Sequence, residues 1–126
     1  MATKSEARRS RRIRAKIPVV YRLDENVKSM VSIGDETVRA ETVNVSVLGA
    51  SVASPYVLPP GIRIHIELDR KPFVEDKEVQ AEPIRALAKV VGIRSERKNV
   101  RLSVMFDKID PGDKELIAAY VERHLK

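Results

Sequence analysis

The sequence of 126 residues contains no cysteine, no tryptophan and only five aromatic residues. Without cysteine, neither a disulfide framework nor a thiolate metal site can form, and a reducing compartment is compatible with the chain. No stretch approaches the ~20 apolar residues that span a bilayer, and residues 1–16 lack the apolar block of a signal peptide. We therefore expect a cytoplasmic protein with no membrane span.

The sequence also lacks the common motifs of catalysis. It contains no HExxH pair, no nucleophile elbow and no GxxxxGK[ST] phosphate loop. Of the two histidines, His65 alternates with outward-facing charged residues, and His124 lies where a helix C-terminus favours a cation. The acidic residues between positions 69 and 78 lack the regular spacing and glycine of a calcium loop. We predict no enzymatic activity, no cofactor and no metal site.

The positive charge is concentrated at the N-terminus. Residues 1–22 carry a net charge of +7, and the rest of the chain carries −1. Such a segment is either a solvated tail or a binding element for phosphate, an anionic membrane or an acidic protein face. The basic residues are Lys4, Arg8, Arg9, Arg11, Arg12, Arg14, Lys16 and Arg22.

Short alternating apolar patterns predict a mainly β chain. In the clearest of them, Ile62–Leu68, every second side chain is apolar, so one face is buried. The residues from Val100 to Phe106 alternate in the same way. The expected strands are 17–23, 37–45, 50–53, 62–68, 84–93 and 100–106, with a charged loop or hairpin tip at 69–82.

The pattern then changes to that of a helix. Asp110 is a suitable N-cap and Pro111 fits the first helical position. An apolar stripe follows at Ile117, Tyr120, Val121 and His124. Six antiparallel strands and one terminal helix predict a small β-barrel, with the helix capping an open end or packing outside.

Two segments have the chemistry of a binding site. Arginines between Arg8 and Lys16 can fork onto phosphate oxygens or onto the O6/N7 edge of guanine. The second segment, Asn44-Val-Ser-Val-Leu-Gly49, interrupts a strand and offers an amide and a hydroxyl for base edges. Gly49 permits either a positive-φ turn or a close backbone approach.

Together and in this order, the two segments resemble the PilZ family, which is marked by R-x-x-x-R and then [D/N]-x-S-x-x-G. The second motif is complete in Asn44, Ser46 and Gly49. The resemblance runs from about Arg8 to Leu125. It implies a six-stranded barrel with a C-terminal helix that binds the bacterial second messenger cyclic di-GMP. Residues 1–10 would form a flexible basic arm, and residues 11–126 a single PilZ domain.

The first motif has two possible registers. Arg8 and Arg12 give a literal R-x-x-x-R, whereas the position adjoining the first strand gives Arg12 and Lys16. Lysine neutralises a phosphate but cannot fork onto it. The resemblance implies that cyclic di-GMP contacts Arg8, Arg9, Arg11, Arg12, Lys16, Asn44, Ser46 and Gly49.

Three functions remain open from the sequence. The leading one is a cyclic di-GMP receptor that changes conformation and partner binding when occupied. The alternative is a degenerate PilZ adaptor, which binds a protein partner with little or no ligand affinity, and Lys16 is the reason to keep it. A surface for nucleic acid or anionic membrane is the third, but the chain lacks the interleaved aromatics of such proteins. We therefore expect no nucleic-acid polymer as a partner.

Overall fold

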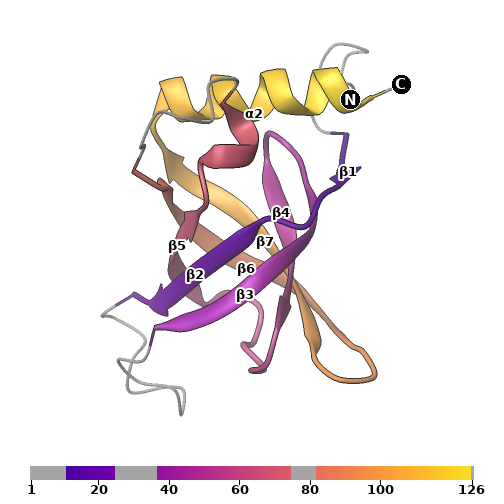
Figure 1. The fold of residues 1–126 in the computed structure, drawn as a ribbon. Coiled ribbons are helices and arrows are strands. Elements are labelled where there is room, and N and C mark those ends of the chain that lie inside the picture. The colour runs from indigo at the N-terminus through magenta and orange to yellow at the C-terminus, as the bar shows by residue number, and fades with distance from the viewer. Residues whose placement is uncertain (1–10, 25–36, 75–81, 126) are drawn as a thin grey trace, which may run out of the picture.

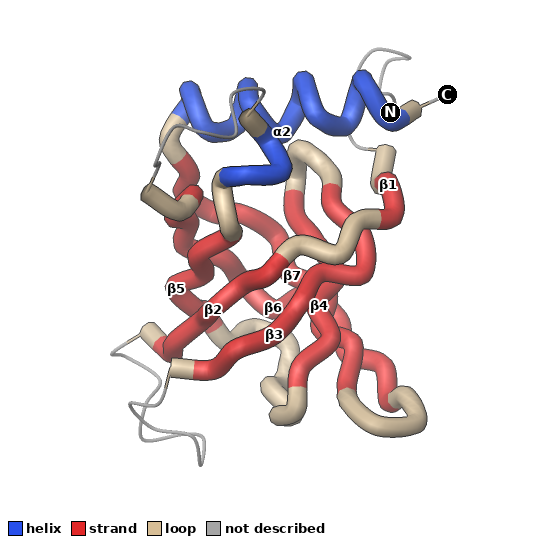
Figure 2. Tube along the Cα trace, viewed as in Figure 1, coloured by secondary structure: helices blue, strands red, loops and turns tan. Residues whose placement is uncertain are grey.

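The computed structural model describes residues 11–24, 37–74 and 82–125, and their path is shown in Figure 1. Strands dominate these residues, with a single α-helix at the C-terminal end (Figure 2). The long strands are β2 (Pro18–Leu23), β3 (Val38–Val45), β4 (Gly49–Ser54), β5 (Arg63–Leu68), β6 (Ile84–Ser95) and β7 (Val100–Ile109). The remaining elements are β1 (Ile13–Arg14), the short 3₁₀-helix η2 (Lys71–Phe73) and α2 (Pro111–His124).

The six long strands close into an antiparallel barrel. Their order is β3-β2-β5-β6-β7-β4, and β4 pairs back with β3. The short strand β1 pairs with Asn44 and Val45 at the end of β3, whereas β2 pairs with the earlier part of β3, up to Glu41. The predicted six-stranded barrel with a C-terminal helix is thus confirmed. Strand β1 was not predicted, and β6 and β7 each extend beyond their expected ends.

The barrel core lies on the predicted faces of β5 and β7. Ile64, Ile66 and Leu68 are at most 1% exposed. Leu102 and Val104 of β7 are fully buried, while Val100 and Phe106 at its two ends pack against the core from half-buried positions. Burial of each such side chain stabilises the fold by roughly 1.5–3 kcal/mol.

Helix α2 crosses one end of the barrel (Figure 1). Its N-cap is Asp110, whose carboxylate accepts hydrogen bonds from the backbone N–H groups of Gly112 and Asp113, as predicted. Of the predicted stripe, Ile117 and Val121 are buried, Tyr120 is half-buried and His124 is exposed. The stripe therefore faces the barrel at its centre and reaches solvent at the helix C-terminus.

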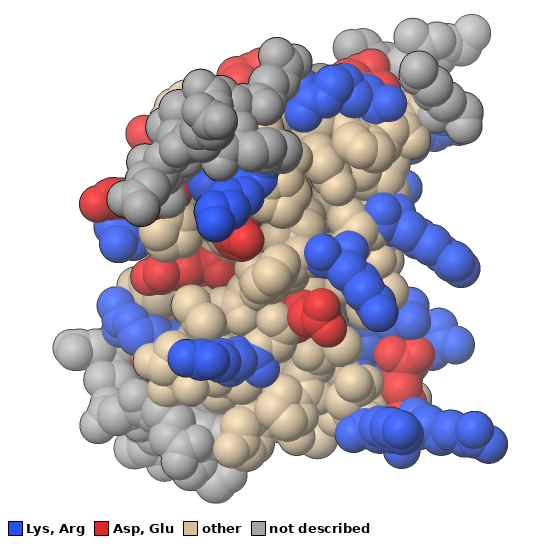
Figure 3. All heavy atoms as spheres, viewed as in Figure 1, with Lys and Arg blue, Asp and Glu red and all other residues tan. Residues whose placement is uncertain are grey.

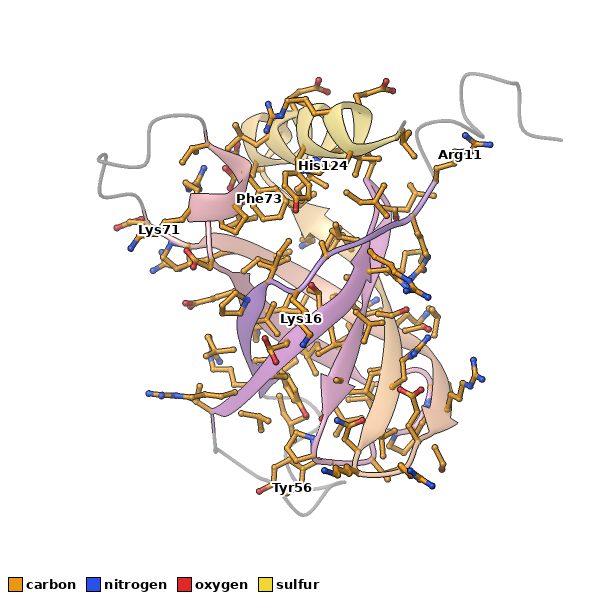
Figure 4. All side chains as sticks on the ribbon, turned by 45° about the vertical axis from the view of Figure 1, so that its right-hand side comes forward. Arg11, Lys16, Tyr56, Lys71, Phe73 and His124 are labelled. Atoms are coloured by element: carbon orange, nitrogen blue, oxygen red, sulfur yellow. The ribbon has the colours of Figure 1, made fainter. Side chains whose placement is uncertain are left out.

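The expected charged loop at 69–82 contains an element that the pattern did not reveal. Helix η2 places Phe73 beneath α2, where its ring meets that of Tyr120 edge-on at 4.9 Å (Figure 4). Beside it, Arg70 donates to Asp113 at 2.7 Å in a mostly buried ion pair. This aromatic contact and this ion pair thus add to the burial of Ile117 and Val121 in attaching the helix to the barrel.

Tyr21 of β2 gives a stability prediction. Its side chain is 1% exposed, and its hydroxyl lies 2.6 Å from Ser54 Oγ. Burial raises the pKa of the Tyr21 phenol, and the hydrogen bond with Ser54 offsets part of that shift. We expect Tyr21→Phe to lower the free energy of unfolding by about 1 kcal/mol at pH ~8. Ser54 keeps its hydrogen bonds to the backbone of Tyr56.

The pH dependence provides the second half of that test. The raised folded pKa means that the unfolded chain releases the phenol proton first, so wild-type stability falls as pH rises above about 10. Tyr21→Phe lacks this contribution. The stability difference between the two proteins, measured by urea unfolding, should therefore shrink between pH ~8 and pH ~10.5. A difference that stays constant would contradict the account.

Candidate functional site

The basic segment before β2 lies along β3. Ile13 pairs with Val45 and Arg14 with Asn44, and the buried side chain of Ile13 anchors the segment in the core. Further on, the Thr42 hydroxyl accepts from the backbone N–H of Ile17 and donates to the carbonyl of Ala15. The backbone on both sides of Lys16 is thus fixed.

The side chains of this segment reach different parts of the surface. Figure 4 shows Arg11 beside the end of α2 and Lys16 over the wall formed by β2 and β3. Arg11, Arg12, Arg14 and Lys16 are all exposed. Figure 3 shows basic side chains gathered along the side of the barrel where β1 and the β6–β7 hairpin lie. An anion approaching that side meets several cations at once.

Arg12 joins the two sequence motifs. Its Nη1 donates to Asn44 Oδ1 and to Ser51 Oγ, both at 2.9 Å. The contact brings together residues that are 32 positions apart in the sequence. Among the described residues only Nη1 has partners, so Nε and Nη2 remain on one edge of the guanidinium as an open fork.

Ser46 and Gly49, the other two residues of the Asn44 motif, form the turn between β3 and β4. Ser46 is 1% exposed, and its hydroxyl accepts from the backbone N–H groups of Leu48 and Gly49, both at 3.2 Å. Its own N–H donates to the Gly49 carbonyl at 2.8 Å. These bonds close a tight turn between β3 and β4. Contact of Ser46 with a ligand stays a prediction.

Gly49 is required because the neighbouring strand β7 comes very close. A Cβ at this position would lie 2.0 Å from the backbone oxygen of Val104. The φ angle is not the reason, since Gly61 is the glycine of the described chain with positive φ. Of the two roles that the sequence left open, close backbone approach is correct. Asn44 is therefore the motif residue whose side chain faces the surface.

Small outward-facing residues form a floor beside Asn44. Strand pairing aligns Asn44, Ser51, Ser103 and Gly92 in one row across β3, β4, β7 and β6. A neighbouring row runs from Glu41 through Ala53 to Arg101. A hollow of about 510 Å³ lies over part of this surface, and its lining includes Arg14, Lys16, Glu41, Asn44, Ala53 and Arg101.

A second hollow lies between β1 and the end of α2. It measures about 450 Å³ and is bordered by Arg11, Arg12 and Arg14 together with His124 and Leu125 at the end of α2. Arg14 borders both hollows. The structure thus brings Lys16 and Asn44 to one hollow and Arg11 and Arg12 to the other, with the Arg12–Asn44 bond between them.

Two of the predicted site residues, Arg8 and Arg9, lie outside the described residues. The flexible arm at 1–10 lies outside them as well. The Arg8/Arg12 register therefore stays a prediction. The geometry of the Arg12/Lys16 register can be described, because both side chains border the surface around Asn44.

A larger hollow, of about 720 Å³, lies over β2, β5, β6 and β7. Two of its polar side chains have partners, since His65 lies 3.1 Å from Asp24 and Arg85 lies 3.5 Å from Glu67. None of the predicted site residues that the structure describes borders it. The smaller hollows, where both motifs meet, are therefore the better candidate despite their size.

Metal ligands, histidines and apolar helices can each be checked in the described residues. They contain no group of three or more His, Cys, Asp or Glu side chains arranged to hold a metal ion. His65 is held by Asp24, and His124 Nδ1 lies 2.7 Å from the carbonyl of Tyr120. Within the same residues, no helix is long and apolar enough to cross a bilayer.

A known family model covers most of the chain. The family model of the PilZ domain matches residues 6–123. The chain belongs to the PilZ family. Regulation or binding, and not catalysis, is the role of PilZ domains. No match was found among curated proteins.

Solved PilZ structures share the fold. MotI/DgrA, the inhibitor of motility of Bacillus subtilis, has a TM-score of 0.72 at 17% identity, with 98% of this chain and 56% of that chain covered. The PilZ domain of YcgR from Escherichia coli, solved with c-di-GMP, has a TM-score of 0.64 at 15% identity, with 92% and 89% covered. A tetrameric PilZ domain from Xanthomonas campestris has a TM-score of 0.60 at 14% identity, with 90% and 85% covered.

These likenesses concern the fold, because the identities are low. This PilZ chain also spans only 56% of the length of MotI/DgrA.

Several residues at the surface described above were not predicted from the sequence, notably Glu41, Ser51 and Arg101. Their outward positions on predicted strands were visible in the alternation. Their neighbourhood depends on strand register, which the pattern does not specify.

Proposed function

We propose that this PilZ domain is a bacterial receptor for cyclic di-GMP. The observation that carries the proposal is the bond between Arg12 and Asn44, which joins the two motifs at the edge of a basic hollow. Asn44 and Ser51 hold the guanidinium in place before any ligand arrives, and its open Nε/Nη2 fork suits a phosphate or a guanine edge. Such preorganisation reduces the entropy lost on binding.

The residues around Arg12 have different proposed roles in binding. Lys16 and Arg14 border the same hollow as Asn44, and they neutralise phosphate charge as the ligand settles. Asn44 supplies an amide for the base, while Ser46 and Gly49 act indirectly by shaping the turn that positions it. We propose no catalytic step, no cofactor and no metal. We also propose that the receptor acts in the cytoplasm.

The output of the receptor is a change in partner binding. Arg11 and Arg12 border a hollow together with His124 and Leu125 at the end of α2, so an anion bound there changes the charge beside the helix end. A protein partner that recognises this end of the barrel would read the difference. Amide exchange of the last turn of α2, with and without ligand, reports whether the helix end responds.

A titration calorimetry experiment with cyclic di-GMP tests the proposal, and variants of the arginine motif identify its register. If Lys16 replaces an arginine of the motif, Lys16→Arg should tighten binding several-fold by restoring the fork. In the same register, Lys16→Ala weakens binding by about ten-fold. A large loss in Arg8→Ala, with Lys16→Ala near wild type, would instead identify the Arg8/Arg12 register.

The second candidate function is an adaptor with little affinity for the messenger. Lys16 at the strand-adjacent motif position favours it, because an ammonium lacks the planar fork. Absence of binding heat at saturating cyclic di-GMP, with a folded protein, would establish this alternative. In that case Lys16→Arg provides a further test, since restoring the fork should create measurable affinity if only this residue is degenerate.

A further inference from the structure

The motif residues leave one part of the 510 Å³ hollow without a role. Its lining includes Glu41 of β3 and Arg101 of β7, which belong to neither motif. Strand pairing places Ala53 of β4 between them, with Glu41 opposite Ala53 and Ala53 opposite Arg101. With about 4.8 Å between neighbouring strands, the two backbones are about 10 Å apart. The methyl of Ala53 leaves space for a planar group between the two charged side chains.

Glu96 holds the Arg101 guanidinium so that its end-on edge, formed by Nη1 and Nη2, is left for a ligand. Its Nε and Nη2 donate to Glu96 at 3.1 and 3.0 Å, which occupies the side-on edge of the guanidinium. The remaining hydrogens of Nη1 and Nη2 form the end-on edge. Both partners of this ion pair are 29% exposed, so the pair is partly shielded. A planar fork fixed in this way is suited to two adjacent acceptors.

Glu41 provides the complementary chemistry. Its side chain is exposed, and within the described residues it makes no ion pair or hydrogen bond. An ionised carboxylate only accepts hydrogen bonds, whereas a guanidinium only donates them. The two sides of the hollow therefore select a planar ligand that presents donors toward Glu41 and acceptors toward Arg101.

Guanine has this arrangement and adenine does not. Guanine presents the N1–H and N2–H₂ donors on one edge and the O6 and N7 acceptors on the next. Adenine keeps the N7 acceptor, but it has a donor at N6 in place of O6 and an acceptor at N1 in place of the N1–H donor. Each charged group would therefore meet one group of its own kind. We propose that Glu41 and Arg101 read one guanine across Ala53 and make the hollow selective for guanine over adenine. This inference rests on the proposed function.

The test is a set of titrations in which each side chain is matched to one base atom. The ligands are cyclic di-GMP, its 7-deazaguanine analogue, which lacks N7, and cyclic di-IMP, which lacks the 2-amino group. In the wild type, each analogue should bind about ten-fold more weakly than cyclic di-GMP. In Arg101→Ala, cyclic di-GMP weakens by about ten-fold and the 7-deaza analogue loses almost nothing further. In Glu41→Gln, the same holds for cyclic di-IMP.

Each analogue changes both bases of the ligand, so a loss of affinity alone does not show which base is read. The decisive result is therefore that the loss for one analogue disappears only in the variant of the side chain proposed to contact the missing atom. Arg94→Ala is the matched control. Arg94 lies opposite Arg101 on β6, is exposed and does not line the hollow, so its loss removes the same charge without the fork. We expect that variant to change affinity less than three-fold and to keep both discriminations.

Outcomes against the two proposals are separate. If wild type binds cyclic di-GMP but the analogue losses persist unchanged in Arg101→Ala and Glu41→Gln, the guanine reading is wrong and the receptor proposal stands. If cyclic di-AMP binds as tightly as cyclic di-GMP, the selectivity claim is also overturned. If wild type binds none of these ligands, the receptor proposal itself fails. Thermal unfolding of each variant confirms that the barrel is intact.

Discussion

Replacing Gly49 with alanine is expected to destabilise the barrel by about 3 kcal/mol or more. The added Cβ would lie 2.0 Å from the carbonyl oxygen of Val104 and 3.0 Å from the Cα of Met105. Both atoms belong to the backbone of β7, so no side chain can rotate away and the strands must move apart. Overpacking of a core typically costs 1–3 kcal/mol, and a clash with backbone lies at or above the upper end of that range.

Urea unfolding followed by circular dichroism measures the effect, and Gly92→Ala is its matched control. Gly92 also lies in a strand of the barrel, but there a Cβ would meet only the side chain of Ser103, at an ordinary 3.6 Å. We expect that control to stay within about 1 kcal/mol of wild type. Equal stability of Gly49→Ala and wild type would show that β4 and β7 are not as close as described.

The sequence predicted the barrel because alternation and burial agree in most strands. Ile62–Leu68 and Val100–Phe106 carry apolar side chains at every second position, so only one face of each can be buried. The helix was equally accessible, since Asp110 and Pro111 mark its start by chemistry that acts within one turn. Strands with one buried face and a helix with a capping residue could therefore be predicted from neighbouring residues alone.

The parts that were missed depend on contacts between distant residues. Strand β1 consists of two residues of a basic segment, and only its pairing with β3 makes it a strand. Helix η2 is recognisable only once Phe73 is seen to pack beneath Tyr120. The pairing of Glu41 with Ala53, and of Ala53 with Arg101, likewise requires the register of three strands.

The candidate site shows the same division. The motifs named Arg12 and Asn44 as site residues, and the structure brings their side chains into contact. They also named Ser46 and Gly49, whose place in the structure is to form the turn that carries Asn44. Whether Ser46 and Gly49 also contact a ligand stays a prediction. Ser51, which completes the hold on Arg12, belongs to no motif.

Arg12→Ala is expected to weaken cyclic di-GMP binding by roughly ten-fold to a few hundred-fold. Arg12 belongs to both possible registers of the arginine motif, so its loss harms binding whichever is used. A hydrogen bond to a charged group contributes about 1.5–3 kcal/mol, and each 1.4 kcal/mol corresponds to about one decade in the dissociation constant. The variant also loses the bridge that holds Asn44 and Ser51 together.

Titration calorimetry at a fixed salt concentration measures this loss, and two further variants separate its causes. Arg12→Lys keeps the charge but not the fork, so it should recover only part of the affinity. Arg39→Ala removes one exposed cation elsewhere on β3, and it should change binding by about two-fold or less because such a charge acts only through screened attraction. Near-wild-type affinity in Arg12→Ala would mean that neither register is the binding site. The adaptor would then be the better account of this chain, because the bond between Arg12 and Asn44 would hold the segment around β1 in place and would not serve a ligand.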